Sequence, residues 1–378
     1  MKMTSPVIFS TLIKYAVLFI ILNLFILFFI QSNPKPILNA NQENILYKVI
    51  LDNEKRVSKE IKIENKRAKL GEDLFNDIRL SKYNNISCAS CHDPNNNFQD
   101  THNITKKTTN KNIKAPSLRG VHQQDWFFWD GRVDSLWSQS LEAIKNEHQL
   151  SMQETIDIVC QNYAKKYADL LSFCHTNDSE IHKYKQIGEL IASYIQTIEH
   201  VWTRFDEFGY QYKKNQQIDP KLLSYDEIEG FKLFIDREKT GCIDCHSDER
   251  FSNDGFYAIG TGNNAQSDRI SGIKKYLSSP YTCEQWNKKE ACLKYYYMRK
   301  EGDDLVGALK VPSLRNLHNS SHFMHDLRFS TLESVIHHYM YPTGYMHDYV
   351  DIKPLRLTPI KRKHLIAFLK ALNEPYSL

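Results

Sequence analysis

The longest apolar run of the chain lies close to its beginning. Residues 15–30 are interrupted only by Asn23, and the longer segment 7–30 contains a single charged residue, Lys14. An apolar segment of this length can cross a bilayer, and Lys2 and Lys14 without a nearby acid favour a cytoplasmic N-terminus. We predict one uncleaved transmembrane helix and export of the rest of the chain; the alternative is a cleaved signal peptide.

Beyond this segment, apolar residues recur at helical spacing in three stretches, 43–80 with an interruption at Gly71, 135–198 and 224–236. No regular strand pattern accompanies them, so we predict a mainly α fold for the exported part. A polar stretch that ends at Pro220 precedes the third helical stretch and marks a candidate domain boundary. The predicted division is a membrane anchor with a linker, an N-terminal domain and a C-terminal domain, at residues 1–40, 41–218 and 219–378.

An internal repeat relates the two predicted domains. Residues 114–122 read KAPSLRGVH and residues 310–318 read KVPSLRNLH, an offset of 196 residues. The same offset continues in three identical pairs, which are Asp130 and Asp326, Arg132 and Arg328, and Leu136 and Leu332. Because the register persists, we interpret the exported part as two halves of one duplicated unit, with a 42-residue insertion in the second half.

Each half contains one CxxCH string. The first is Cys88-Ala89-Ser90-Cys91-His92 and the second is Cys242-Ile243-Asp244-Cys245-His246. This string attaches haem c through two thioether bonds and supplies the adjacent histidine as proximal iron ligand. A zinc site would lack partner ligands, and a redox CxxC requires a βαβ context that is missing here. We predict two covalent haem c groups, with His92 and His246 as proximal ligands.

The remaining four cysteines form two closely spaced pairs, Cys160 with Cys174 and Cys283 with Cys292. An even number of cysteines at short spacing in an exported chain favours two local disulfides. The alternative is four buried free thiols, because cysteine is also a common small core residue. We predict the two disulfides.

Net charge bears on the class of partner. The formal net charge is +4, but the first 40 residues contain Lys2, Lys14 and Lys35 and no acid, so the exported part is nearly neutral. A nucleic-acid-binding domain usually presents an excess of basic residues. We therefore expect no nucleic-acid partner.

The sixth coordination position of each haem decides what the haem can do. An iron with two protein ligands moves electrons, whereas an iron with one can bind a small ligand such as peroxide. Tyr339 and Met340 are candidate ligands in the second half, and the repeat offset aligns Tyr339 with Ala143. Since alanine cannot bind iron, we expect an open first haem and a closed second one. A purely structural role for Tyr339 as a core aromatic residue is the alternative.

Several short motifs follow one another in a specific order between residues 69 and 370. They are Leu70-Gly71, Leu74-Phe75, Arg79-Leu80-Ser81, Phe98-Gln99-Asp100, Phe128-Trp129-Asp130-Gly131-Arg132, Val311-Pro312-Ser313-Leu314-Arg315-Asn316, His325-Asp326 and Thr331-Leu332-Glu333. Their order resembles that of the bacterial di-haem cytochrome c peroxidase family, which includes the MauG-type enzymes. The resemblance implies two all-α cytochrome c-like domains, a peroxidatic N-terminal haem and an electron-relay C-terminal haem.

The resemblance also implies roles for single residues. Trp129 falls on the family's aromatic residue between the haems, Gln139 on a glutamine near the open haem, and Glu147 on a distal glutamate for general acid–base catalysis. The chain is two residues shorter than the family pattern between Gln139 and Glu147, so Glu142 stays an alternative. Tyr339 falls where electron-relay peroxidases carry Met and MauG-type enzymes carry Tyr.

A family calcium site between the haems is another feature in which this sequence departs from the family pattern. The family uses an Asn side chain where this chain has Lys114, and an ammonium group there argues against the ion. Its other ligands, largely carbonyl groups, would lie around Ser320 and His322. Calcium is therefore possible but not favoured.

Together these predictions describe a periplasmic di-haem c oxidoreductase anchored to the inner membrane by its N-terminal helix. The leading hypothesis is reduction of hydrogen peroxide to water, with electrons from a small periplasmic cytochrome or cupredoxin arriving through the second haem and Trp129. The alternative is a MauG-like enzyme that uses a bis-haem high-valent state to oxidise aromatic side chains of a partner protein. A pure electron-transfer cytochrome would need a strong sixth ligand on both irons.

Overall fold

The structure is a computed structural model that describes residues 37–52, 66–100, 113–214, 219–261, 268–286, 292–317, 320–342 and 350–376. It divides into two compact units, Met1–Ile45 and Leu46–Leu378, and the haem site lies in the second. The predicted transmembrane segment, residues 7–30, lies outside the described residues. Within the part of the chain that is described, no helix combines the length and apolar character needed to cross a membrane.

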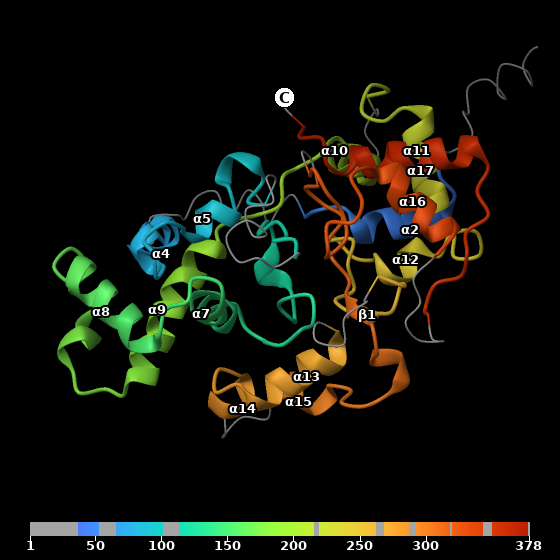
Figure 1. Ribbon diagram of the computed structural model, residues 1–378. Coiled ribbons are helices and arrows are strands. Elements are labelled where there is room, and N and C mark those ends of the chain that lie inside the picture. The colour runs from blue at the N-terminus through green and yellow to red at the C-terminus, as the bar shows by residue number, and fades with distance from the viewer. Residues whose placement is uncertain are drawn as a thin grey trace, which may run out of the picture. The chain divides into compact units, whose positions relative to one another are not determined.

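Helices dominate the described residues (Figure 1), which confirms the predicted mainly α fold. The α-helices are α2 (Ala40–Val49), α4 (Lys66–Asn76), α5 (Cys88–Cys91), α7 (Leu136–Asn146), α8 (Met152–Tyr163), α9 (Glu180–Ile195), α10 (Arg204–Lys213), α11 (Tyr225–Phe234), α12 (Cys242–Cys245), α13 (Arg269–Ser278), α14 (Cys283–Trp286), α15 (Leu293–Tyr297), α16 (Leu332–Met340) and α17 (Pro359–Ala371). Short 3₁₀ turns cover Ile78–Leu80, Pro94–Asn96, Val121–Gln123, Ser172–His175 and Asp303–Leu305. Two short strands, β1 (Phe256–Tyr257) and β2 (Leu309–Lys310), pair antiparallel with Phe256 opposite Lys310.

Local sequence signals set where several helices begin. Ser151 precedes α8, where its side chain accepts from the backbone N–H of Glu154 while the Glu154 carboxylate accepts from the backbone N–H of Ser151. The same reciprocal capping box starts α10 at Thr203 and α11 at Ser224. Each box satisfies two backbone donors that have no partner inside the helix.

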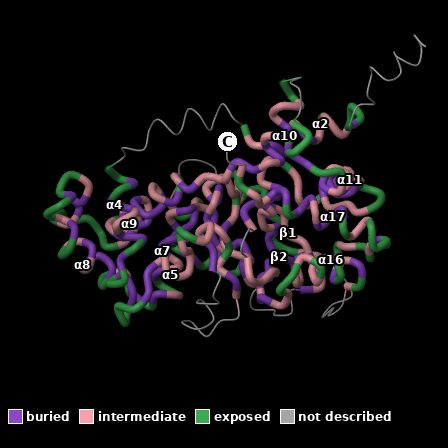
Figure 2. Tube along the Cα trace, turned by 90° about the horizontal axis from the view of Figure 1, so that it is seen from above, coloured by how far each residue is buried: buried purple, intermediate pink, exposed green. Residues whose placement is uncertain are grey.

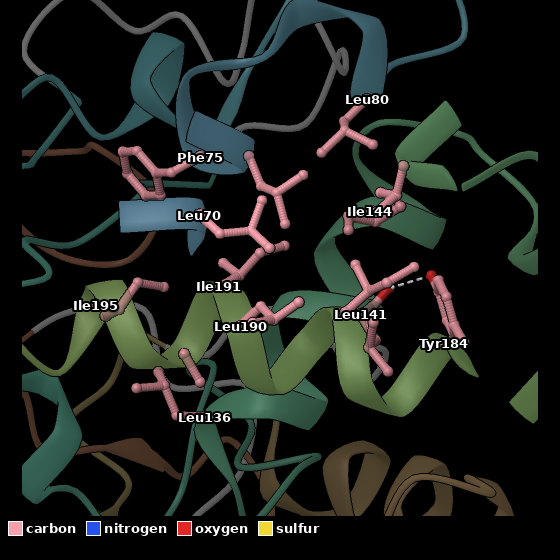
Figure 3. Packing of buried hydrophobic residues seen from close by; sticks show 14 of the residues in the cluster. Leu70, Phe75, Leu80, Leu136, Leu141, Ile144, Tyr184, Leu190, Ile191 and Ile195 are labelled. Carbon is pink, nitrogen blue, oxygen red and sulfur yellow. Dashed lines mark hydrogen bonds between the residues drawn. The ribbon is translucent and has the colours of Figure 1, made fainter. Parts of the chain in front are cut away.

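The core of the N-terminal half is built from α4, α7 and α9. Figure 3 shows Leu70 of α4 beside Ile191 of α9 in this cluster of buried residues. Gly71, expected from the sequence to interrupt the first helix, lies inside α4, and a Cβ atom there would stand 2.1 Å from the carbonyl oxygen of Leu190. The glycine therefore permits close packing of α4 on α9 instead of ending the helix.

The core of the C-terminal half is an aromatic cluster between α10, α11 and α17. Phe205, Phe231, Phe234, Phe251 and Phe368 contact one another with ring centres 5.2–6.0 Å apart. Phe205 belongs to α10, so this helix packs with the C-terminal half although it precedes residue 218. The domain boundary at residues 218 and 219 stays a prediction. Buried residues run through both halves (Figure 2).

The insertion of the second half packs against the first. Trp286 contacts Trp137 with ring centres 5.9 Å apart, and Tyr281 contacts Tyr184 at the same distance. Both predicted disulfides are confirmed, with Cα atoms 5.6 Å apart in the pair Cys160–Cys174 and 5.9 Å apart in the pair Cys283–Cys292. The second disulfide closes a loop within this insertion.

Candidate functional site

One cavity of about 1410 Å³ connects the two CxxCH motifs. Cys88, Cys91 and His92 line it from the N-terminal half, and Cys242, Cys245 and His246 line it from the C-terminal half. The remaining sequence-predicted site residues, Trp129, Gln139, Glu147 and Tyr339, line the same cavity. The fold thus brings together residues that are up to 251 positions apart in the sequence.

The first motif forms the short helix α5. Ser87 and Ser90 cap its start reciprocally, and the backbone N–H of His92 closes it by donating to the carbonyl of Cys88 at 2.9 Å. The imidazole Nδ1 lies 3.2 Å from the carbonyl oxygen of Phe98. A carbonyl can only accept, so Nδ1 donates, and the neutral ring keeps its lone pair on Nε2.

The second motif repeats this arrangement in α12. The helix starts at Gly241, whose φ of +63° lies in the left-handed region that glycine adopts without strain. The backbone N–H of His246 donates to the carbonyl of Cys242 at 2.8 Å, and Nδ1 donates to the carbonyl of Phe251 at 2.9 Å. Again Nε2 is the atom that remains available as a ligand.

These two groups of residues fit haem c. The four motif cysteines are not in disulfides, so each motif offers two thiols for thioether bonds. Burial lowers the pKa of His92 and lowers that of His246 to about 4, so both imidazoles are neutral ligands at neutral pH. The hydrogen bonds from Nδ1 to a backbone carbonyl fix the tautomer and ring orientation that iron binding by Nε2 requires.

Helix α7 brings the predicted distal residues of the first half to the cavity. Gln139, Ala143 and Glu147 follow at intervals of four residues, which places them on one helical face, and all three line the cavity. Glu147 is the C-cap of α7, with its backbone N–H bonded to the carbonyl of Ala143. Glu142 also lines the cavity, but its carboxylate accepts from Asn146 Nδ2 at 2.7 Å near the surface.

His148 is a cavity residue that the sequence analysis missed. It is buried, and its Nδ1 donates to the carbonyl of Leu80 at 2.6 Å. Burial lowers its pKa, and it lines the same cavity as His92. Its position next to Glu147 was the only sequence signal, because the contact with Leu80 joins residues that are 68 positions apart.

Tyr339 and Met340 end α16 and have different surroundings. Tyr339 lines the cavity, whereas Met340 is buried and does not line it. Burial raises the pKa of the Tyr339 phenol, and the nearby thiols of Cys242 and Cys245 raise it further. His338, the preceding residue, uses Nε2 to donate to the carbonyl of Ile259 at 2.7 Å.

Trp129 lies at a junction between the two halves. Its indole Nε1 donates to the carbonyl of Lys114 at 3.0 Å, and its own carbonyl accepts from the backbone N–H of Lys310 at 2.8 Å. The backbone N–H of Lys114 donates in turn to the carbonyl of His325 at 2.7 Å. At the repeat offset, Lys114 is equivalent to Lys310 and Trp129 is equivalent to His325. Each half therefore donates one backbone hydrogen bond to the other, from the lysine at the same repeat position. The rings of Trp129 and His325 meet edge to face with centres 6.2 Å apart, a contact that the sequence analysis did not foresee.

The side chain of Lys114 reaches from this junction into the second half. Its Nζ donates to Ser320 Oγ and to the carbonyl of His322, the latter at 2.7 Å. The ammonium also lies 5.6 Å from the ring centre of Phe323. Burial lowers the pKa of Lys114 to about 8, against the opposing influence of the Asp100 carboxylate.

Comparison with known families matches the first part of the chain. A family model described as di-haem cytochrome c peroxidase matches residues 65–215. The methylamine utilization protein MauG of Methylorubrum extorquens is 27% identical over 316 residues, which cover 82% of this chain and 79% of that protein. A cytochrome c551 peroxidase of Nitrosomonas europaea is 27% identical over 273 residues, which cover 71% of each chain.

Solved structures share the fold. The diheme peroxidase BthA from Burkholderia thailandensis matches with a TM-score of 0.64 and 20% identity, over 83% of this chain and 87% of that one. A MauG-like protein associated with microbial copper homeostasis matches with a TM-score of 0.59 and 20% identity, over 83% and 91% of the respective chains. Both matches extend over the two halves of the second unit.

Proposed function

We propose that the chain reduces hydrogen peroxide to water with electrons from a small periplasmic donor protein, because residues 65–215 match the di-haem cytochrome c peroxidase model and similar proteins include MauG and a cytochrome c551 peroxidase. This similarity supports an oxidoreductase with two covalently bound haem c groups. Reduction of one peroxide to two waters consumes two electrons and two protons. The protein must therefore deliver both to one place.

The residues that hold the cofactors follow from the chemistry of the two motifs. Cys88, Cys91 and His92 hold the first haem, and Cys242, Cys245 and His246 hold the second. When bound, the haems supply an iron that coordinates peroxide in the N-terminal half and a second redox centre that takes up the donor's electrons.

The observation that carries the proposal is the difference between α7 and α16. At equivalent repeat positions, α7 presents Ala143 to the cavity and α16 presents Tyr339. The alanine methyl group leaves space for a small ligand on the first side. On the second side, the phenol oxygen of Tyr339 would serve as a ligand and close the site.

Glu147 is the proposed general acid–base residue. A carboxylate beside bound peroxide takes the proton of one oxygen and delivers it to the other, which then leaves as water. Glu147 lines the cavity on the same helical face as Gln139. The side-chain amide of Gln139 can donate a hydrogen bond to the same peroxide. Glu142 is the alternative, but its bond to Asn146 engages the carboxylate elsewhere.

Trp129 is the proposed electron relay between the halves. It lines the cavity that joins the two motifs, and backbone groups from both halves hold its indole N–H and its carbonyl. A fixed aromatic ring between two redox centres shortens each electron-transfer step. The neighbouring ring of His325 keeps the indole orientation by packing.

A MauG-like activity is the second candidate, and Tyr339 favours it. The phenol oxygen is a harder donor than a thioether sulfur and stabilises the oxidised iron, which makes the second haem a poor electron acceptor. With Tyr339 as its ligand, the second haem would supply oxidising chemistry, which suits the oxidation of aromatic side chains of a partner protein. Tyr339 lines the cavity and Met340 does not, which supports the tyrosine as ligand.

Steady-state peroxide consumption by the holoprotein, with a reduced small cytochrome or cupredoxin as donor, distinguishes the two candidates. Rapid turnover that is first order in donor supports the peroxidase. Slow turnover, together with oxidised aromatic residues in an added protein substrate, supports the MauG-like activity. A protein that consumes no peroxide with any donor or substrate would contradict both and leave an electron-transfer cytochrome.

The cellular setting is also a proposal. Haem c attachment and the two disulfides suit an oxidising compartment outside the cytoplasm, and we place the protein in the periplasm. The apolar segment 7–30 would anchor it to the inner membrane. Fractionation of cells that express the full chain tests this: the protein stays with the membrane after a salt wash if the segment is an uncleaved anchor.

A further inference from the structure

We propose that the Lys114 ammonium group is a built-in cation that fixes the junction around Trp129, and that the protein therefore binds no calcium ion at Ser320 and His322. The ammonium donates to Ser320 Oγ and to the carbonyl of His322, two oxygens that lie more than 200 residues further along the chain. These neutral oxygens are the ligand type that calcium prefers, and here a lysine side chain already occupies them.

Because Lys114 is buried, its contact with Ser320 and His322 contributes to the stability of the fold. The residue is only 6% exposed, and its ammonium also faces the ring of Phe323. A buried ammonium is stable only when oxygens replace its lost water. Ser320 and His322 provide these oxygens, so the side chain holds the segment 320–323 of the second half to the first half.

The backbone of Lys114 forms hydrogen bonds that position Trp129. The Lys114 carbonyl accepts the indole N–H, and the Lys114 N–H donates to the carbonyl of His325. One residue therefore binds the segment 320–325 through its side chain and its main chain, and positions the indole at the same time. Lys114 is a positioning residue for the relay, not a group that touches a reactant.

For electrostatic reasons, either the Lys114 ammonium or a divalent ion can bind at Ser320 and His322, but not both. A calcium ion bound to Ser320 and His322 would stand within a few ångströms of the ammonium, and the repulsion between these charges in a buried site is large. Calcium could enter only if the lysine side chain left. The inference concerns metal binding and stability, so its test does not depend on the function proposed above.

The test compares the wild-type holoprotein with Lys114→Asn and Lys114→Met in EGTA and in millimolar calcium. Wild type should bind no calcium at this site by titration calorimetry and keep the same Tm in both buffers. Lys114→Asn removes the ammonium and adds a third neutral oxygen, so we expect a Tm lowered by roughly 2–6 °C in EGTA and restored by calcium. Lys114→Met should lose stability in both buffers, because it offers no oxygen.

Lys310→Asn is the matched control. Lys310 occupies the equivalent repeat position and is buried to the same degree, at 7% exposure, but its side chain does not bind Ser320 or His322. Its variant should show no calcium rescue. A wild-type protein that binds calcium at Ser320 and His322, or that loses stability in EGTA, would overturn the proposal, as would a Lys114→Met variant with unchanged Tm. Because the wild-type measurements need no variant, the proposal stays testable even if a variant does not fold.

Discussion

In the N-terminal half, α7 presents Gln139, Ala143 and Glu147 to the haem cavity, whereas in the C-terminal half α16 presents Tyr339. The haem attachments of the two halves are otherwise alike. Each proximal imidazole donates from Nδ1 to the carbonyl of a phenylalanine, Phe98 or Phe251, whose φ is close to +50°. The two halves therefore differ in the residues that α7 and α16 present to the cavity and agree in how their CxxCH histidines are held.

A second difference lies in the arginines of the repeated PSLR strings. Arg315 is completely buried and forms an ion pair with Asp206, with nitrogen–oxygen distances of 2.8 and 2.9 Å, while it also donates to the carbonyl of Val49. Arg119 is partly buried, and among the described residues it donates to two neutral oxygens, Asn97 Oδ1 and the carbonyl of Glu199, both at 3.1 Å. The same sequence string thus supports a buried charge pair in one half and a neutral network in the other.

The largest expected effect concerns the distal side of the first half. Glu147→Gln keeps the shape of the side chain but removes its capacity to take a proton, so peroxide cleavage should slow by about two to four orders of magnitude. Stopped-flow mixing of the reduced holoprotein with peroxide measures the rate, and both haem spectra should stay unchanged.

Glu142→Gln is the matched control, because this carboxylate also lines the cavity, lies five residues earlier and accepts from Asn146. Its rate should stay near that of wild type. If Glu142→Gln slows the reaction and Glu147→Gln does not, the two residues exchange roles.

The next largest effect concerns the buried ion pair of the second half. Arg315→Met leaves the Asp206 carboxylate without its cation in the protein interior, which should cost about 3–5 kcal/mol of unfolding free energy. Urea unfolding of the holoprotein measures the loss, with haem content determined in parallel. A loss below about 1 kcal/mol would mean that hydrogen bonds from Thr203 and Leu51 alone satisfy Asp206.

A spectroscopic effect distinguishes the two haems. The wild-type ferric protein should show one high-spin component that shifts with cyanide, because only the Ala143 side is open. Tyr339→Phe should add a second high-spin component and alter the potential of the second haem, while Met340→Leu, a change at the neighbouring buried residue, should do neither. The reverse result would identify a Met-ligated relay, and a fully low-spin wild-type spectrum unmoved by cyanide would contradict an open haem.

The features that the sequence predicted are those whose chemistry is contained in a short string or a regular repeat. The two CxxCH motifs and the two disulfides, whose cysteines are 14 and 9 positions apart, belong to this class. The sequence also suggested Trp129, Gln139, Glu147 and Tyr339, and all four line the cavity.

The features that it missed depend on contacts between distant residues. His148 enters the cavity because it binds the carbonyl of Leu80, and His325 meets Trp129 only through the pairing of the two halves. The packing of α10 with the C-terminal half includes the pair of Asp206 and Arg315, which are 109 positions apart. Periodicity along one segment carries no information about such partners, since each residue by itself is an ordinary helical or loop residue.

The smallest effect completes the comparison of the two arginines. Arg119→Met makes the same side-chain change as Arg315→Met, but it leaves behind two neutral oxygens in place of a buried carboxylate. Asn97 and Glu199 are only partly buried, so water can replace the arginine at their oxygens, and the loss should be about 1–2 kcal/mol. The same urea experiment measures it, and the two variants together report the difference in burial and partner charge between the halves. Equal losses for both variants would contradict this explanation, because the two sites would then depend on the arginine side chain itself and not on the charge of its partner.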